Sequence, residues 1–261
     1  MSVGHYENFP VASLLLPSWA RAPVALIYRF ARSADDLADE GDDPADVRLR
    51  KLNDYRRELD APRAPLFLEI EKLIREHELP KALFCDLLDA FRQDVVKKRY
   101  GDYAELLDYC RRSANPVGRL LLHLFKRTSE SDLGRSDAIC TALQLINFWQ
   151  DVEVDFAKER IYLPQDEMAR FGVTESQIAQ KRCDANFRGL LQFQVERTKA
   201  LMLTGAPLGR TLPGRIGLEI RATVAGGLRI LEKIRAADYD VFRHRPVLRA
   251  FDWPLLLLRA A

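Results

Sequence analysis

The segment YRFARSADDLADE, residues 28–40, begins as an apolar helix pattern and ends in acidic residues. Asp35 and Asp39 are four residues apart, so a helix places them one turn apart on one face, with Tyr28 and Arg32 close to that face. Two carboxylates stacked in this way repel each other by roughly 0.2–0.5 kcal/mol. The repulsion indicates that a cation compensates the pair in the folded protein.

A second segment, QLINFWQDVEVD at residues 144–155, repeats this arrangement with Asn147, Asp151 and Asp155 at four-residue spacing. The residues between them are largely apolar, so we expect the polar stripe to face into the protein. One Asp-x-x-x-Asp pair is common on solvated helices, but two pairs in apolar surroundings favour a metal site. Mg²⁺ binds one or two carboxylates together with substrate phosphates. We therefore predict a site for Mg²⁺ and a diphosphate, with the ligands Asp35, Asp39, Asn147, Asp151 and Asp155.

Helical patterns dominate the chain, and few segments alternate with the two-residue period of a strand. No linker divides the sequence, so we predict one all-α domain over residues 1–261. Pro116 is expected to kink one long helix, because proline removes a backbone donor. The pair Gly226-Gly227 indicates either a close helix contact or space for a ligand. We expect helices at residues 17–40, 45–59, 66–77, 81–96, 102–126, 136–156, 184–203 and 215–237.

The composition of the chain excludes several classes of function. A formal net charge of +2 over 261 residues argues against a nucleic-acid partner, which needs a concentrated basic excess. Four cysteines without a Cys-x-x-Cys spacing are typical of reduced thiols in a cytoplasmic protein. We find no signal-peptide pattern and no apolar run of about 20 residues that would span a membrane. The tail WPLLLL, residues 253–258, predicts a packed C-terminal helix, with peripheral contact at the inner face of the membrane as the alternative.

The two acidic segments, and FAKERIYLP at residues 156–164 after the second, resemble the squalene/phytoene synthase family of trans-isoprenyl diphosphate synthases. The resemblance extends from His5 to about Arg243. It implies an isoprenoid synthase-type helical bundle with a central apolar cavity. It also implies that the two Asp-x-x-x-Asp motifs lie on facing helices and hold Mg²⁺ against an isoprenoid diphosphate.

The opening HYENFPVAS, residues 5–13, resembles the hydroxysqualene synthases of bacterial hopanoid pathways, and so does Gln150, where squalene and phytoene synthases usually have Arg. This resemblance implies a lyase that converts presqualene diphosphate and water to hydroxysqualene and diphosphate, without NADPH. An enzyme that supplies presqualene diphosphate is the expected pathway partner, and physical contact with it is left open. Gln150 is the one candidate that we name for positioning the water.

The expected site combines charged, polar and apolar side chains. Arg32 and Arg160 would add fixed positive charge beside the diphosphate, and Gln144 would bond a phosphate oxygen or a metal-bound water. Aromatic faces can stabilise a carbocation. The catalytic set is Asp35, Asp39, Asp151, Asp155, Arg32 and Tyr28. The substrate-binding set is His5, Asn8, Phe9, Tyr109, Val117, Gly118, Gln144, Arg160 and Tyr162.

Two alternatives remain open. A head-to-head condensing squalene, phytoene or presqualene diphosphate synthase would act as a prenyltransferase on farnesyl or geranylgeranyl diphosphate, and Gln150 counts against it. A non-catalytic scaffold homologue would tend to lose acidic motif residues, whereas all four motif aspartates are present.

Overall fold

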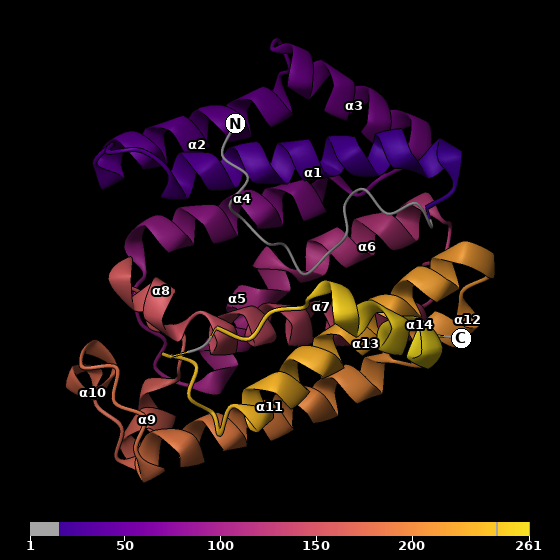
Figure 1. Cartoon of the computed structure of the whole chain (residues 1–261). Helices are drawn as coiled ribbons and strands as arrows, with labels where there is room; N and C mark the ends of the chain where they lie inside the picture. Colours follow the sequence, from indigo (N-terminus) through magenta and orange to yellow (C-terminus); the bar gives the residue numbers. More distant parts are fainter. Residues whose placement is uncertain (1–15, 244, 261) are drawn as a thin grey trace.

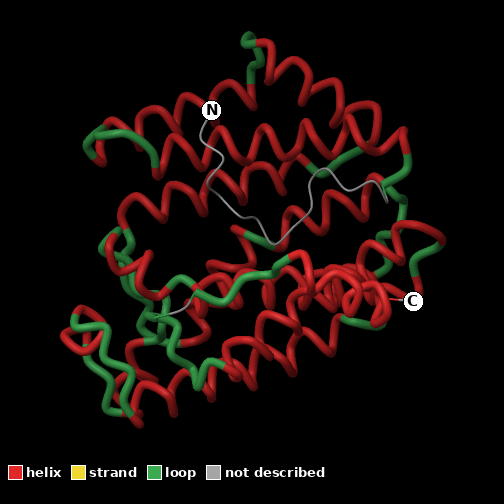
Figure 2. The backbone as a smooth tube through the Cα atoms, viewed as in Figure 1, coloured by secondary structure: helices red, strands yellow, loops and turns green. Residues whose placement is uncertain are grey.

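The computed structural model describes residues 16–243 and 245–260, and helices make up the architecture of this part of the chain (Figure 1). The first helices are α1 (Ser18–Asp39), α2 (Ala45–Asp60), α3 (Pro65–His77), α4 (Lys81–Val96), α5 (Tyr103–Ser113), α6 (Asn115–Leu124) and α7 (Glu130–Gln150). They are followed by α8 (Val152–Ala157), α9 (Gln165–Phe171), α10 (Glu175–Ala179), α11 (Ala185–Gly205), α12 (Leu208–Thr211), α13 (Gly214–Ala236), the short 3₁₀ helix η1 (Ala250–Asp252) and α14 (Trp253–Ala260). Figure 2 draws no strand in these residues, which confirms the predicted all-α fold.

One helix with a kink at Pro116 was expected at residues 102–126. This prediction is wrong, because the segment forms two separate helices. α5 ends at Ser113, and α6 begins at Asn115 with Pro116 in its first turn. A proline is tolerated there because the first-turn N–H has no partner within the helix. Pro116 therefore starts a new helix and lets the chain change direction.

The helix expected at residues 136–156 also has different bounds. α7 begins at Glu130, because the Ser129 side chain caps it by accepting a hydrogen bond from the Asp132 N–H at 3.1 Å. It ends at Gln150, and Asp151 separates it from α8. Neither the cap at Ser129 nor the interruption at Asp151 was predicted from the sequence.

Helices α1 to α4 form one packed group, in the upper part of Figure 1. Phe30 of α1 is fully buried and meets the rings of Phe84 and Phe67 edge-on, with ring centroids 5.3 and 6.1 Å apart. Burying an aromatic side chain of this size contributes roughly 1.5–3 kcal/mol. This core fixes α1 against α4 and thereby fixes the acidic end of α1.

Helices α7, α11 and α13 form a second group, in the lower part of Figure 1. The fully buried Trp149 donates its indole N–H to the Thr198 hydroxyl at 2.8 Å, which ties α7 to α11. A methyl group added at Gly227 of α13 would lie 3.2 Å from Ile146 Cδ1 of α7. Gly227 thus serves a close helix contact, which is one of the two roles expected for the glycine pair.

The C-terminal segment packs on α13 through a buried carboxylate. Asp252 is 1% exposed and accepts hydrogen bonds from Arg229 Nε at 2.9 Å, from the Arg249 N–H at 2.8 Å and from Lys233. α14 contacts α13, as expected for a packed C-terminal helix. Among the described helices, none combines the length and apolar character that a membrane span requires.

We expect Asp252→Asn to lower the free energy of unfolding by about 2 kcal/mol, because hydrogen bonds to charged groups contribute about 1.5–3 kcal/mol. Burial alone would raise the pKa of Asp252, but its hydrogen bonds from Lys233, Arg249 and Arg229 lower it to about 2. The stabilisation should therefore be complete above about pH 4 and should disappear as the pH falls towards about pH 2.

Urea denaturation of both proteins at about pH 7 and about pH 3 tests this expectation. Asp54→Asn is the matched control, because Asp54 pairs with Arg57 on the surface and its removal should change stability little. Equal stability of wild type and Asp252→Asn at neutral pH would contradict the prediction.

Candidate functional site

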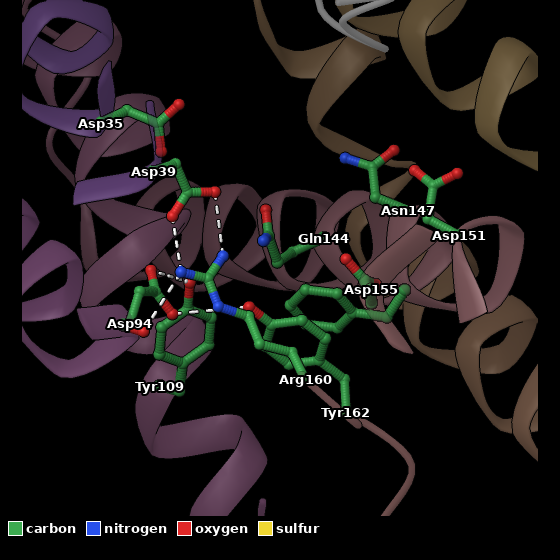
Figure 3. Close-up of a pocket in the computed structure, with 11 residues that line it drawn as sticks. Asp35, Asp39, Asp94, Tyr109, Gln144, Asn147, Asp151, Asp155, Arg160 and Tyr162 are labelled. Carbon is green, nitrogen blue, oxygen red and sulfur yellow. Dashed lines mark hydrogen bonds and ion pairs between the residues drawn. The ribbon is translucent and has the colours of Figure 1, made fainter. Parts of the chain in front are cut away.

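Residues from both helix groups line one pocket that connects to solvent. Figure 3 shows the two acidic motifs on opposite sides of this space, with Gln144 between them. The lining residues are Asp35, Asp39, Asp94, Tyr109, Gln144, Asn147, Phe148, Asp151, Asp155, Arg160 and Tyr162. The structure therefore brings together all five residues that the sequence predicts as metal ligands.

The first acidic motif is placed by the last turn of α1. About a third of the Asp35 side chain is exposed, and Arg32 lies 3.2 Å from it and 2.7 Å from Asp36. Burial by the surrounding protein, together with the charge of Asp39, raises the pKa of Asp35 to about 6. The local positive charge of Arg32 thus does not fully compensate the acidic cluster.

Asp39 is compensated by a forked ion pair with Arg160. Arg160 Nη1 and Nη2 donate to the two carboxylate oxygens at 2.9 and 2.5 Å, and Lys158 lies 3.1 Å from one of them. Burial would raise the pKa of Asp39, but Arg160 and Lys158 lower it to about 2. Arg160 is 8% exposed, and its buried Nε has no hydrogen-bond partner in the described part of the chain. One donor of the guanidinium thus remains unused at the pocket.

The second acidic motif keeps its one-turn spacing although the helix is interrupted at Asp151. The Asp151 N–H bonds the Asn147 carbonyl at 2.9 Å, and the Asp155 N–H bonds the Asp151 carbonyl at 2.8 Å. Arg245 Nη2 lies 2.9 Å from the Asp151 carboxylate. Burial and the charge of Asp151 raise the pKa of Asp155 well above its ordinary value. Asp155 is therefore a second incompletely compensated acid in the pocket.

The donors fit a divalent cation that is shared with a substrate. Within residues 16–243 and 245–260, no three His, Cys, Asp or Glu side chains are close enough together to hold a metal ion alone. Each motif could instead supply one or two carboxylate oxygens, and a bound cation would oppose the burial and the neighbouring carboxylate charge that raise the pKa of Asp35 and Asp155. Mg²⁺ is commonly held in this way, by few carboxylates plus phosphate and water.

Asp94 also lines this pocket, although no role was predicted for it from the sequence. Tyr109 donates its hydroxyl hydrogen to Asp94 at 2.7 Å, and the Tyr162 hydroxyl lies 3.4 Å from it. Burial raises the pKa of Asp94 to about 7, although Arg160 and the Tyr109 hydrogen bond oppose the shift. A signal was available, because Asp94 continues the buried face of Leu87 and Ala90 at helical spacing.

Aromatic rings complete the wall next to Asp94. The rings of Phe148 and Tyr162 stack with centroids 3.7 Å apart and planes within 8°. The ring centroids of Tyr109 and Phe148 are 6.1 Å apart. Tyr109 and Tyr162, two of the predicted substrate-binding residues, thus border the acidic pocket, and Phe148 is a further wall residue that was not predicted from the sequence.

The remaining predicted residues lie elsewhere. Tyr28 and Arg32 are on α1 but do not border this pocket as the described residues define it. Val117 packs against the core, and Gly118 lines a separate, narrow apolar pocket. A methyl group at Gly118 would collide with Ser136 and Cys140, so α6 approaches α7 closely there. His5, Asn8 and Phe9 lie outside the described residues.

Comparison with known proteins assigns the chain to a family. Residues 3–252 match the family model for squalene/phytoene synthase. A hydroxysqualene synthase from Rhodopseudomonas palustris is 34% identical over 236 residues, which cover 89% of this chain and 80% of that protein. A phytoene synthase from Mycobacterium bovis is 32% identical over 245 residues, covering 92% of this chain and 81% of that protein.

The fold agrees with this assignment. The crystal structure of squalene synthase HpnC from Alicyclobacillus acidocaldarius matches with a TM-score of 0.83 and 36% identity, and the match covers 90% of each chain. The helical bundle is thus of the isoprenoid synthase type. The two acidic motifs, the family model and the shared fold agree, and the chain belongs to the squalene/phytoene synthase family.

Proposed function

We propose that this protein is a hydroxysqualene synthase, which converts presqualene diphosphate and water to hydroxysqualene and diphosphate on the way to squalene and hopanoids. The observation that carries the diphosphate chemistry of this proposal is the pocket in which Asp35 and Asp39 face Asp151 and Asp155. A diphosphate leaves readily only when its charge is neutralised, and such a pocket suits a cation-bound diphosphate.

In this proposal, different residues of the pocket have different roles in the reaction. Mg²⁺ bound by the carboxylates of the two motifs and by Asn147 would supply Lewis-acid chemistry for diphosphate departure. Arg160 would contribute a fixed positive charge suited to forked contacts with phosphate oxygens. Tyr109, Phe148 and Tyr162 would shield the carbocation from bulk water and from stray nucleophiles. Gln144, between the motifs, would bond a phosphate oxygen or a metal-bound water.

The choice of the water-capture reaction rests on the branch resemblance. Gln150 stands where squalene and phytoene synthases usually have Arg, and the relative from Rhodopseudomonas palustris is a hydroxysqualene synthase. No NADPH is expected for this reaction. We treat residues 1–261 as one catalytic domain, and an enzyme that produces presqualene diphosphate is its expected neighbour in the pathway.

A condensing prenyltransferase is the second candidate, because the chain is also 32% identical to a phytoene synthase. It would join two farnesyl or geranylgeranyl diphosphates head to head. The acidic pocket serves both reactions equally well, so the substrate must be decided by product analysis. A non-catalytic scaffold is disfavoured, because all four motif aspartates border the pocket.

We also propose that the protein is cytoplasmic and contacts the membrane peripherally. The C-terminal segment exposes Phe251, Trp253 and Leu258 by 66%, 49% and 76%. Arg243 and Arg249 are exposed near these residues in the sequence. Aromatic and apolar side chains with basic neighbours are typical of segments that bind a bilayer interface.

Product analysis tests the proposed reaction. Purified protein incubated with presqualene diphosphate and Mg²⁺ should form hydroxysqualene with or without NADPH, because water is the nucleophile and no reductant takes part. Farnesyl diphosphate in a parallel incubation should give no condensed product. Squalene formed only with NADPH, or presqualene diphosphate formed from farnesyl diphosphate, would move the protein to the reductive or condensing reaction.

Asp151→Asn should lower turnover at least about a thousandfold, because it removes one charge of the ligand set that stabilises the departing diphosphate. Thermal unfolding should show that the variant remains folded. Glu153→Gln is the matched control: it makes the same change two residues away, on a side chain that pairs with Lys181 and does not border the pocket. Unchanged turnover in Asp151→Asn would remove Asp151 from the metal site.

Co-sedimentation with anionic lipid vesicles tests the membrane proposal. The triple variant Phe251→Ser, Trp253→Ser, Leu258→Ser should bind at least about tenfold more weakly than wild type, because it loses apolar area at the interface. Leu203→Ser is the control, since Leu203 is an exposed apolar residue of α11. Equal binding of wild type and triple variant would exclude this segment as the contact.

A further inference from the structure

Arg245 forms a forked ion pair with Asp151 of the second acidic motif. Arg245 Nη2 donates to one carboxylate oxygen at 2.9 Å, and Arg245 Nε donates to the other. Asp151 borders the acidic pocket, and about a fifth of its side chain is exposed. The guanidinium of Arg245 therefore lies at the edge of this pocket, in contact with one of its carboxylates, although it comes from 94 residues further along the chain.

This ion pair has a counterpart at the first acidic motif. Arg160 makes the same forked contact with both carboxylate oxygens of Asp39. The hydrogen bond to Asp151 raises the pKa of Arg245, and the charges of Asp151 and Asp155 raise it further. Each motif thus has one arginine bonded to one of its aspartates, and the charge of Arg245 acts on both aspartates of the second motif.

The loop that carries this arginine, residues 245–249, has no regular secondary structure but is held by two helices. Gln150, the last residue of α7, donates from its side-chain amide to the Pro246 carbonyl at 2.5 Å. Lys233 of α13 donates to the next carbonyl, that of Val247, at 2.7 Å. Two adjacent backbone carbonyls therefore fix the loop to α7 and to α13.

Gln150 and Asp151 hold neighbouring residues of this loop. Gln150 is 3% exposed and bonds the backbone of Pro246, while Asp151 bonds the side chain of Arg245. Gln150 borders neither pocket, so the structure does not support the expectation that it positions a water. Its contact instead limits the freedom of the loop directly beside Arg245. A side chain that is ordered before binding loses less conformational freedom when its ligand arrives.

We propose that Arg245 binds the diphosphate of the substrate and that Gln150 is the residue that positions Arg245, an assignment that rests on the function proposed above. A phosphate group that shares a cation with Asp151 lies beside that carboxylate, within reach of a guanidinium already bonded to it. Once a cation compensates the charge of Asp151, the fork of Arg245 is available for phosphate oxygens, which it fits in the same two-point manner. Gln150 touches no substrate and acts through Arg245.

Calorimetric binding of inorganic pyrophosphate in the presence of Mg²⁺ tests this assignment. Arg245→Met keeps the length of the side chain but removes its charge, and it should weaken binding at least about tenfold. Gln150→Met fills the same buried space but cannot hold the Pro246 carbonyl, and it should weaken binding at least about fivefold. In the Arg245→Met background, Gln150→Met should change the affinity less than about twofold, because its effect passes through Arg245. Thermal unfolding checks that each variant is folded.

Arg243→Met is the matched control, because it removes the same charge two residues away from a side chain that pairs with Asp240. It should bind pyrophosphate like wild type. Unchanged or tighter binding by Arg245→Met would overturn the proposal, and tighter binding would mean that Arg245 competes with the cation for Asp151. A full effect of Gln150→Met in the Arg245→Met background would overturn the positioning role. A wild type that binds no pyrophosphate with Mg²⁺ refutes the proposed function itself, and the role of Arg245 falls with it.

Discussion

The forked ion pair between Arg160 and Asp39 is the interaction on which the site depends. It joins the end of α1 to the segment after the second acidic motif, 121 residues further along the chain. Five carboxylates border the pocket, and they would repel one another strongly in a partly buried space. Arg160 compensates Asp39, whereas burial and the charge of a neighbouring aspartate raise the pKa of Asp35 and of Asp155. The remaining negative charge is what makes the pocket suited to a bound cation.

The residues of α7 that follow this charge cluster change from polar to apolar along the helix. Along α7 the polar residues Asp151, Asn147, Gln144 and Thr141 follow one another at three- or four-residue spacing, and Cys140 next to Thr141 borders the apolar pocket. A substrate with a diphosphate head and a hydrocarbon body also changes from polar to apolar along its length. On our proposals, the acidic end binds the leaving group, and the aromatic wall near Tyr109 covers the reacting carbon.

Local spacing in the sequence was sufficient to predict the acidic site. The four-residue repeats identified Asp35, Asp39, Asp151 and Asp155, which do face one pocket, and Pro116 marked a real discontinuity. The sequence could not predict features that depend on distant partners. The bond from Tyr109 to Asp94 and the fork from Arg160 to Asp39 exist only because separate helices pack together. Helix α7 begins earlier than expected because a single serine caps it, a signal weaker than hydrophobic periodicity.

The most direct test of the account is calorimetric binding of inorganic pyrophosphate, with and without Mg²⁺. If the two motifs share a cation with the diphosphate, wild type should bind pyrophosphate at least about tenfold more tightly with Mg²⁺, and Arg160→Ala should lose most of that affinity. Arg99→Ala is the control, because Arg99 pairs with Glu175 and does not border the pocket. Equal affinity with and without Mg²⁺, or no pyrophosphate binding at all, would contradict the assignment of the acidic pocket.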